Sequence, residues 1–189
     1  MNTNPSPTRK ARALATRERI LDAAHVEFAR HGFAGARVDR IAERAGSNKR
    51  LIYAHFGDKD GVFDAVLERN LETVASRVPF EADDLPSYAE RLFDYWTAHP
   101  DRLRLFMWRN LERAERTPIQ SFEAYPEWIE QIRIRKPGLE ADIPAHHLFD
   151  LVLALASAWV VPVDESQLPP ADEVQRRRKS VREAVRRFS

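Results

Sequence analysis

Apolar residues recur at helical spacing along the whole chain. The N-terminal part holds three such stretches, listed in chain order: Ile20, Leu21, Ala24 and Phe28; Val38, Ile41, Ala42 and Ala45; Ile52 and Phe56. A fourth, longer stretch carries Val62, Phe63, Val66, Leu67, Leu71 and Val74. Intervals of three and four residues place such side chains on one face of an α-helix. We therefore predict three helices followed by a long fourth one.

The rest of the chain keeps this periodicity and shows no alternating pattern typical of strands. Prolines punctuate it at positions 79, 86, 100, 118, 126, 137, 144, 162, 169 and 170. Because proline is tolerated in the first turn of a helix and excluded from its interior, these positions separate helices. We predict helices near 87–98, 101–116, 122–136, 145–161 and 171–187. The expected fold is all-α, with about nine helices: a three-helix head, a long connecting helix and a C-terminal helical bundle.

The second and third predicted helices meet at a tight turn. Gly46 suits the left-handed position that ends a helix, and Asn48 is a favourable N-cap for the next one. Ile52 and Phe56 point to the core, which leaves a cationic and aromatic face outside. Two short helices joined in this way form a helix-turn-helix, whose second helix can enter the major groove of DNA.

Candidate DNA contacts lie on and around this outward face: Arg37, Asn48, Lys49, Arg50, Leu51, Tyr53, His55 and Lys59. Lysine and arginine suit guanine edges and phosphates, and leucine can touch a thymine methyl group. The tyrosine hydroxyl and the histidine can donate to backbone oxygens. Lys59 occupies the first turn of the long fourth helix, where backbone N–H groups also favour a phosphate.

The motifs in residues 16–24, 28–33, 41–46 and 52–60 together resemble the DNA-binding domain of TetR-family transcriptional regulators. The resemblance covers about a quarter of the chain. It implies that the positions at the start of the third helix and in the first turn of the fourth contact DNA. It also implies an effector pocket among the middle helices of the body and a dimer joined through the last two helices.

Three positions depart from the family pattern. Arg37 stands where Ser or Thr often caps the second helix, which suggests a charged phosphate contact in place of the cap. Ser47 replaces the usual apolar residue after the glycine. Arg50 replaces a small residue after the lysine, and this longer side chain predicts a changed operator preference.

Charge is distributed unevenly although the net charge is only +1. Residues 1–56 hold 11 Lys/Arg and 5 Asp/Glu, whereas residues 57–145 hold 12 and 18. A basic head on an acidic body is expected when one domain binds nucleic acid and the other does not. We therefore expect a disordered tail at 1–8, a DNA-binding domain at 9–57 and an effector-binding and dimerisation domain at 58–189. The basic stretch 9–19 either follows a phosphate backbone or is a solvated arm.

Aromatic residues cluster in the acidic body. At helical spacing they form either ordinary core or an aromatic-lined cavity for a small molecule. We take Trp96, Met107 and Trp108 as candidate effector-pocket residues and expect an apolar or amphipathic ligand.

The last two predicted helices each carry an apolar stripe, which either packs on the body or joins two subunits. We expect a homodimer through Leu148, Leu151, Val152, Leu155, Trp159, Val174, Val181 and Val185. A two-fold pair of recognition helices would read a palindromic operator in double-stranded DNA.

Other classes of function find little support in the sequence. There is no cysteine, and the longest apolar run, 148–163, is interrupted and shorter than the roughly 18 residues of a membrane span. Asp22 and His25 have the spacing of a di-iron half-site, but it occurs once. We expect a cytoplasmic protein without membrane contact, cofactor, metal or catalytic site. The alternatives are a DNA-binding regulator without an effector, or a helical-bundle enzyme or carrier.

Overall fold

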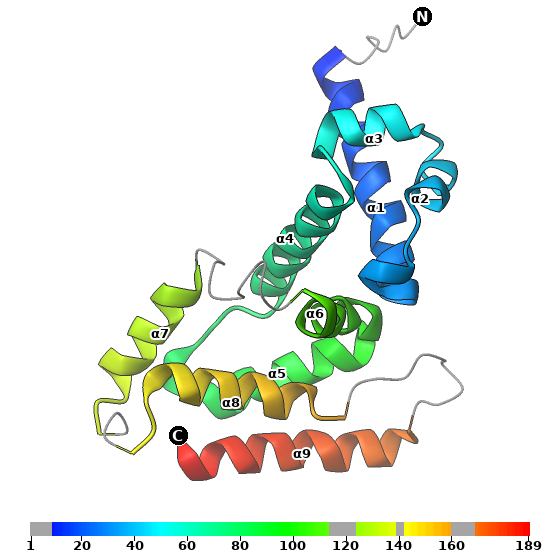
Figure 1. Ribbon diagram of the computed structural model, residues 1–189. Coiled ribbons are helices and arrows are strands. Elements are labelled where there is room, and N and C mark those ends of the chain that lie inside the picture. The colour runs from blue at the N-terminus through cyan, green and yellow to red at the C-terminus, as the bar shows by residue number, and fades with distance from the viewer. Residues whose placement is uncertain (1–8, 114–123, 139–141, 160–168) are drawn as a thin grey trace, which may run out of the picture.

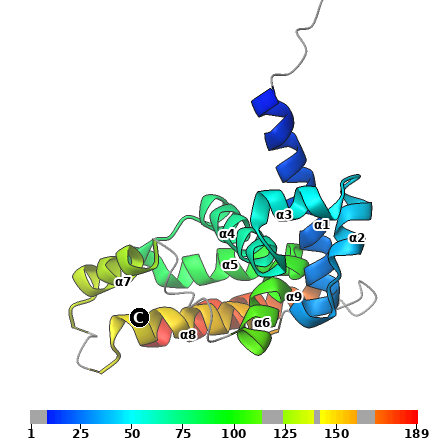
Figure 2. The same cartoon turned by 45° about the horizontal axis from the view of Figure 1, so that its top comes forward.

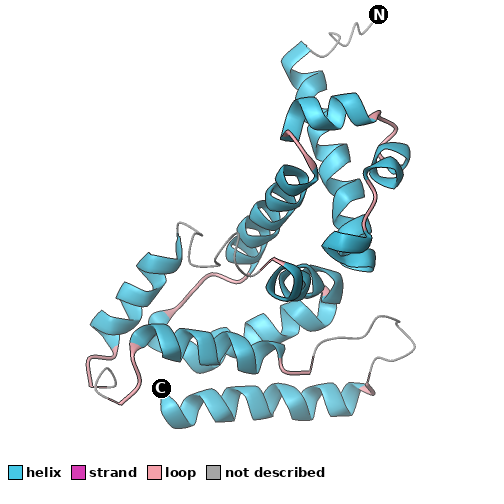
Figure 3. Cartoon of the chain, viewed as in Figure 1, coloured by secondary structure: helices cyan, strands magenta, loops and turns pink. Residues whose placement is uncertain are grey.

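The computed structural model describes residues 9–113, 124–138, 142–159 and 169–189; the predicted tail at 1–8 lies outside these ranges. The described residues form nine α-helices and one short 3₁₀ helix, without a strand (Figure 3). In chain order they are α1 (Arg9–Gly35), α2 (Val38–Arg44), α3 (Lys49–Phe56), α4 (Lys59–Arg77), η1 (Ala82–Asp84), α5 (Leu85–Ala98), α6 (Pro100–Glu112), α7 (Ala124–Arg135), α8 (Ala145–Ser157) and α9 (Ala171–Phe188). The all-α prediction is confirmed.

Helices α1 to α4 form the head, at the top of Figure 1. Their fully buried side chains are those that the periodicity predicts: Ile20, Leu21, Ala24, Phe28, Ile41, Ile52, Val62 and Phe63. The rings of Phe28 and Phe63 meet edge to face with centroids 4.8 Å apart. Aromatic pairs prefer this arrangement, and it fixes α1 against the start of α4.

The body consists of α5 to α9, with α5 and α8 lying along α9 (Figure 1). Leu92, Phe149, Val181 and Val185 on these three helices are buried. Ion pairs add to this contact, since buried Glu90 of α5 accepts from Arg182 of α9 at 2.8 Å. The last helix is therefore an integral part of the body.

Several helix ends differ from the predicted ones. Gly32 is of the residue type that most often ends a helix, yet α1 bends there, at φ 70° and ψ 179°, and continues to Gly35. Helix α6 ends at Glu112, and the next residue, Arg113, leaves the helical conformation with its guanidinium bonded to α4. Helix α8 ends at Ser157, four residues before the predicted end. The bend at Gly32 and the end of α6 lie at contacts with distant helices, which a local pattern does not contain.

The head meets the body mainly where the end of α1 packs on α6. Trp108 Nε1 of α6 donates to the carbonyl oxygen of Ala29 at 3.3 Å, and Glu112 Oε2 accepts from the Ala34 N–H at 2.7 Å. Arg113 Nη2 lies 2.9 Å from Asp60 Oδ1, and its Nη1 lies 2.9 Å from Asp64 Oδ1. The end of α6 is thus joined to both α1 and α4.

No helix within the described ranges combines the length and apolar character needed to cross a membrane.

Candidate nucleic-acid interface and effector cavity

The turn between α2 and α3 has the conformation that the sequence predicts. Gly46 has φ 57°, and a Cβ built there would meet nothing within 4 Å. Glycine is therefore required for its backbone conformation and not for space. The N–H groups of Gly46 and Ser47 donate to carbonyl oxygens of Glu43 and Ala42, at 3.1 and 2.9 Å. These bonds close α2 and direct the chain into α3.

Asn48 caps α3, as predicted. Its backbone is extended, and its side-chain oxygen Oδ1 accepts from the Leu51 N–H at 2.8 Å. Ile52 is fully buried one turn later and anchors the helix to the head. These two residues fix where α3 begins and which face it turns outward.

The outward face of α3 carries Lys49, Arg50, Leu51 and Tyr53, all exposed. Leu51 is 38% exposed and Tyr53 42%, which are large fractions for side chains that carry so much apolar surface. His55 is half-buried, with its ring centroid 6.0 Å from that of Phe56. Among the described residues, this side of α3 therefore presents two cations and two partly exposed apolar side chains to the surroundings.

The predicted cations have different surroundings. Lys49 Nζ lies 2.6 Å from Asp39 Oδ1, and this hydrogen bond raises the pKa of Lys49. Lys59 Nζ donates to the carbonyl oxygen of Ala34 at 3.4 Å and lies 4.8 Å from the centre of the Phe33 ring. Arg50 forms no ion pair with any described residue. A phosphate would compete with Asp39 for Lys49 but would meet no such competitor at Arg50.

The N-terminus of α2 is held by a buried carboxylate that the sequence analysis missed. Arg37 is the N-cap residue, but its side chain makes no capping hydrogen bond. Glu27 of α1, only 3% exposed, accepts instead: its Oε1 lies 2.9 Å from the Arg37 nitrogen and 2.7 Å from Arg40 Nε. The signal in the sequence was a carboxylate next to Phe28 on the apolar stripe, where burial requires a partner.

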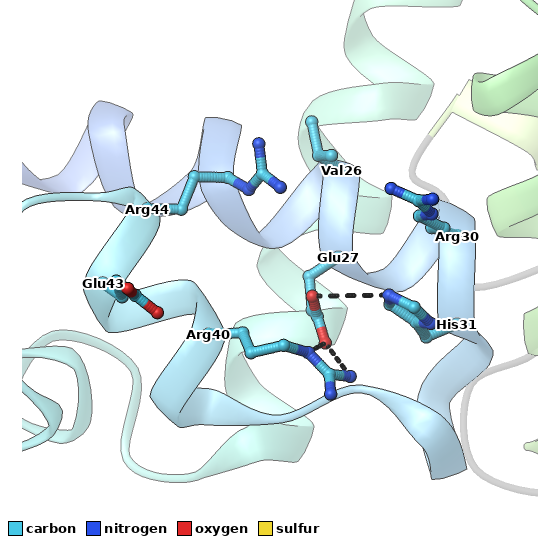
Figure 4. Close-up of a pocket in the computed structure, with 7 residues that line it drawn as sticks. All are labelled: Val26, Glu27, Arg30, His31, Arg40, Glu43 and Arg44. Carbon is cyan, nitrogen blue, oxygen red and sulfur yellow. Dashed lines mark hydrogen bonds and ion pairs between the residues drawn. The ribbon is translucent and has the colours of Figure 1, made fainter.

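The surroundings of Glu27 favour its charged form. Burial raises the pKa of Glu27, but the hydrogen bonds from Arg40 and the Arg37 N–H, with the charges of Arg40 and His31, outweigh burial. The pKa is therefore lowered from its usual value. The Glu27 carboxylate points toward both Arg40 and His31 (Figure 4).

These residues border a surface hollow of about 400 Å³ between α1 and α2. It is lined by Val26, Glu27, Arg30, His31, Arg40, Glu43 and Arg44 (Figure 4). The lining is mostly charged, and Glu27 and Arg40 are already paired with each other. The hollow therefore has the character of an ion-pair network that holds α2 on α1.

A second cavity, also of about 400 Å³, lies between the C-terminal half of α4 and the body. Most of its lining is apolar or aromatic: Leu71, Val74, Ala75, Tyr88, Leu92, Trp96, Phe106, Tyr125, Trp128, Phe149, Leu153 and Ala154. Asn110, Asp150 and Ser157 supply the polar groups. The Tyr125 hydroxyl donates to Asp150 Oδ1 at 2.5 Å. An apolar enclosure with a few polar groups is typical of small-molecule sites.

Of the three candidate pocket residues, the structure places Trp96 in this lining and leaves Met107 and Trp108 out of it. Phe106 and Asn110, one turn apart on α6, face the cavity. Trp108 lies on another side of the helix and contacts α1. The periodicity identified α6 as partly buried but did not tell which of its faces meets the cavity. Trp96 therefore remains a candidate pocket residue, and Met107 and Trp108 do not.

The candidate dimer residues also divide into two groups. Leu148, Val152, Val181 and Val185 are fully buried within one chain and have no surface to offer a second subunit. Leu151 is 45% exposed, Trp159 is 43% exposed, and Leu155 and Val174 are half-buried. The apolar stripes thus face the body of their own chain, and the candidate set is reduced to the second group.

Two protein-family models match the chain, one over the head and one over the body. The family model "Bacterial regulatory proteins, tetR family" matches residues 20–66, and "Tetracyclin repressor-like, C-terminal domain" matches residues 84–187. The HTH-type transcriptional repressor SCO4008 of Streptomyces coelicolor is 40% identical over 156 residues, covering 80% of this chain and 81% of that protein. The repressor NicS of Pseudomonas putida is 32% identical over 121 residues, covering 60% and 57%.

Solved structures share the fold. The putative transcriptional regulator SCO4942 of Streptomyces coelicolor superimposes with a TM-score of 0.74 at 34% identity, covering 91% of this chain and 97% of that one. A regulator from Aquifex aeolicus, at 18% identity, has a TM-score of 0.68 over 92% of this chain and 99% of its own. With matching family models over both head and body, the chain belongs to the TetR family of DNA-binding transcriptional regulators.

Proposed function

We propose that the protein is a dimeric repressor that binds a palindromic operator and leaves it when a small apolar or amphipathic effector enters the body. The cavity in the body is the observation that carries the effector part of the proposal. The names of the relatives SCO4008 and NicS, both repressors, favour repression over activation. We assign DNA binding to residues 9–57, effector binding and dimerisation to residues 58–189, and the place of action to the cytoplasm.

In this proposal Lys49, Arg50, Leu51, Tyr53 and His55 contact bases and backbone in the major groove. Arg37 and Lys59 flank them and bind phosphates. The exposed face of α3 supports this assignment, because Leu51 and Tyr53 keep 38% and 42% of their surface exposed although both are largely apolar.

Two helices connect the cavity to the head. Leu71, Val74 and Ala75 of α4 line the cavity, and Phe63, near the start of α4, packs on Phe28 of α1. Helix α6 contributes Phe106 to the cavity, and Arg113, the residue after its end, is bonded to α4. An effector that favours one tilt of these helices would shift the head toward a spacing that fits the operator poorly.

Selection from a random pool of duplex DNA at moderate salt, with the mass of the free protein recorded, tests operator binding. We expect an enriched palindrome and a dimer. A double variant, Lys49→Ala with Tyr53→Ala, should lose the operator and keep the dimer mass. Full operator affinity in this variant would refute the assignment of α3. Leu151→Asp should give a monomer, because it places a charge on the exposed face of α8.

Tryptophan fluorescence against a panel of aromatic and amphipathic metabolites tests the effector. Trp96 and Trp128 line the cavity, whereas Trp108 and Trp159 do not. A ligand in the cavity should change the fluorescence of the wild type, and Trp96→Phe with Trp128→Phe should remove that change. Trp159→Phe serves as the control and should keep it. A silent panel would favour the alternative of a regulator without an effector.

A further inference from the structure

The first turns of α1 extend beyond the head. In both views they project past α3 and away from the body (Figures 1 and 2). We call residues 9–19 the N-terminal arm. All of its residues are exposed except Thr16 and Arg17, which are half-buried. Eleven residues of α-helix extend about 16 Å, so the arm is as long as several base-pair steps.

The arm is strongly cationic. It carries Arg9, Lys10, Arg12, Arg17 and Arg19, and its one carboxylate is Glu18. Arg9, Lys10 and Arg12 form no ion pair with any residue in the described ranges. The first turn of α1 contains no acidic residue, although the partial positive charge at a helix N-terminus disfavours cations there. Helix stability therefore does not account for these charges.

Three of the cations, Arg9, Lys10 and Arg17, lie on the side of α1 that carries its buried stripe. Arg9 precedes Ile20 by three helical turns, and Lys10 and Arg17 precede Ala24 by four and two turns. Ile20 and Ala24 are fully buried. The guanidinium carbon of Arg17 lies 5.4 Å from the centre of the Phe56 ring, at the end of α3. This side of the arm therefore continues the candidate DNA interface.

We propose that the N-terminal arm binds the phosphate backbone of DNA beside the half-site that α3 contacts. A helix about 10 Å wide does not fit a minor groove about 6 Å wide, so the arm lies along the phosphates. Phosphate contacts add affinity without reading sequence. The proposal rests on DNA binding through α3 and assigns the arm a separate role, the sequence-independent part of the affinity.

The test compares two triple variants of the full chain. In the arm variant, Arg9, Lys10 and Arg12 are replaced by alanine, which keeps the helix because alanine has the highest helix propensity. In the control variant, Arg133 and Arg135 of α7 and Lys136, the residue that follows this helix, are replaced by alanine. Both variants lose the same charge. Circular dichroism confirms that each is folded.

Binding to the selected operator and to a scrambled duplex is measured over a series of salt concentrations. Each phosphate contact contributes a slope of about −0.9 in log affinity against log salt. Three contacts in each of two subunits would make the slope of the arm variant shallower by up to about 5. The operator and the scrambled duplex should weaken by the same factor, and the control variant should keep the wild-type slope.

An unchanged slope in the arm variant would overturn the proposal and leave operator recognition by α3 intact. Loss of operator preference at unchanged affinity for the scrambled duplex would also overturn it, because the arm would then read bases. Binding to vesicles that contain phosphatidylserine is measured for the same proteins. If the arm variant binds these vesicles more weakly than the wild type but binds both duplexes equally well, the arm serves a membrane surface and the proposal is wrong. If the wild type selects no operator at all, the proposed function itself fails.

Discussion

Substitution of Gly32 by alanine should destabilise the joint between head and body. The backbone at Gly32, with φ 70° and ψ 179°, lies in a region that is essentially restricted to glycine, and a side chain there is strained by about 1–3 kcal/mol. A Cβ would also lie 2.7 Å from Glu112 Oε1 and 3.0 Å from Trp108 Cε3. Moving Glu112 weakens its bond to the Ala34 N–H, worth about 1 kcal/mol at this exposed position.

Together these effects lower the free energy of unfolding by about 3 kcal/mol, which for a chain of this size shifts Tm by roughly 6–12 °C. Thermal unfolding followed by circular dichroism, at one fixed protein concentration, measures this shift. Gly138→Ala is the matched control, because nothing lies within 4 Å of a Cβ at Gly138 and its φ is not left-handed. If the two variants melt within about 1 °C of each other, the assigned strain and crowding at Gly32 are absent.

Three further predictions concern the head. Asn48→Ala should lower the free energy of unfolding by about 1 kcal/mol, because the side-chain oxygen no longer accepts from the Leu51 N–H. Asn48→Asp keeps this cap, so it should melt near the wild-type temperature but bind the operator more weakly. The lowered pKa of Glu27 means that its charged form stabilises the fold above the usual carboxyl pKa and that this contribution is lost as pH falls through the lowered value. Urea unfolding of Glu27→Gln should therefore show a flatter acid dependence than the wild type, and parallel curves would contradict this. Arg113→Met keeps the apolar stem but removes both ion pairs to α4, so the free energy of unfolding should fall by about 2 kcal/mol. An unchanged urea midpoint would show that these ion pairs do not contribute to stability.

The helix-turn-helix could be predicted from sequence in detail because its determinants are local. Gly46 and Asn48 decide where one helix ends and the next begins, and both act within four residues of their own position. Asp58 caps α4 in the same way, with Oδ1 accepting from the Gly61 N–H at 2.8 Å. The exposed face of α3 then follows from the burial of Ile52.

Features that depend on distant residues could not be predicted. The bend at Gly32 depends on Trp108 and Glu112, which are more than seventy residues away in the chain. The same contact turns Trp108 away from the cavity. On α8 and α9 the apolar periodicity showed that one face of each helix is buried. The same periodicity is expected whether that face packs on the body of its own chain or on a second subunit. Contacts between helices decide this, and they place Leu148 and Val181 inside one chain.

One helix, α1, joins the N-terminal arm to the joint at Gly32, and its length makes the arm the most displaced part of α1 in any rotation about that joint. From Arg9 to Gly32 it extends about 35 Å at 1.5 Å per residue. A rotation of about 5° at Gly32 moves the tip at Arg9 by about 3 Å, the length of a hydrogen bond, and moves Arg17 beside α3 by about 2 Å. A small rotation where α1 meets α6 therefore displaces the N-terminal arm more than any other part of α1.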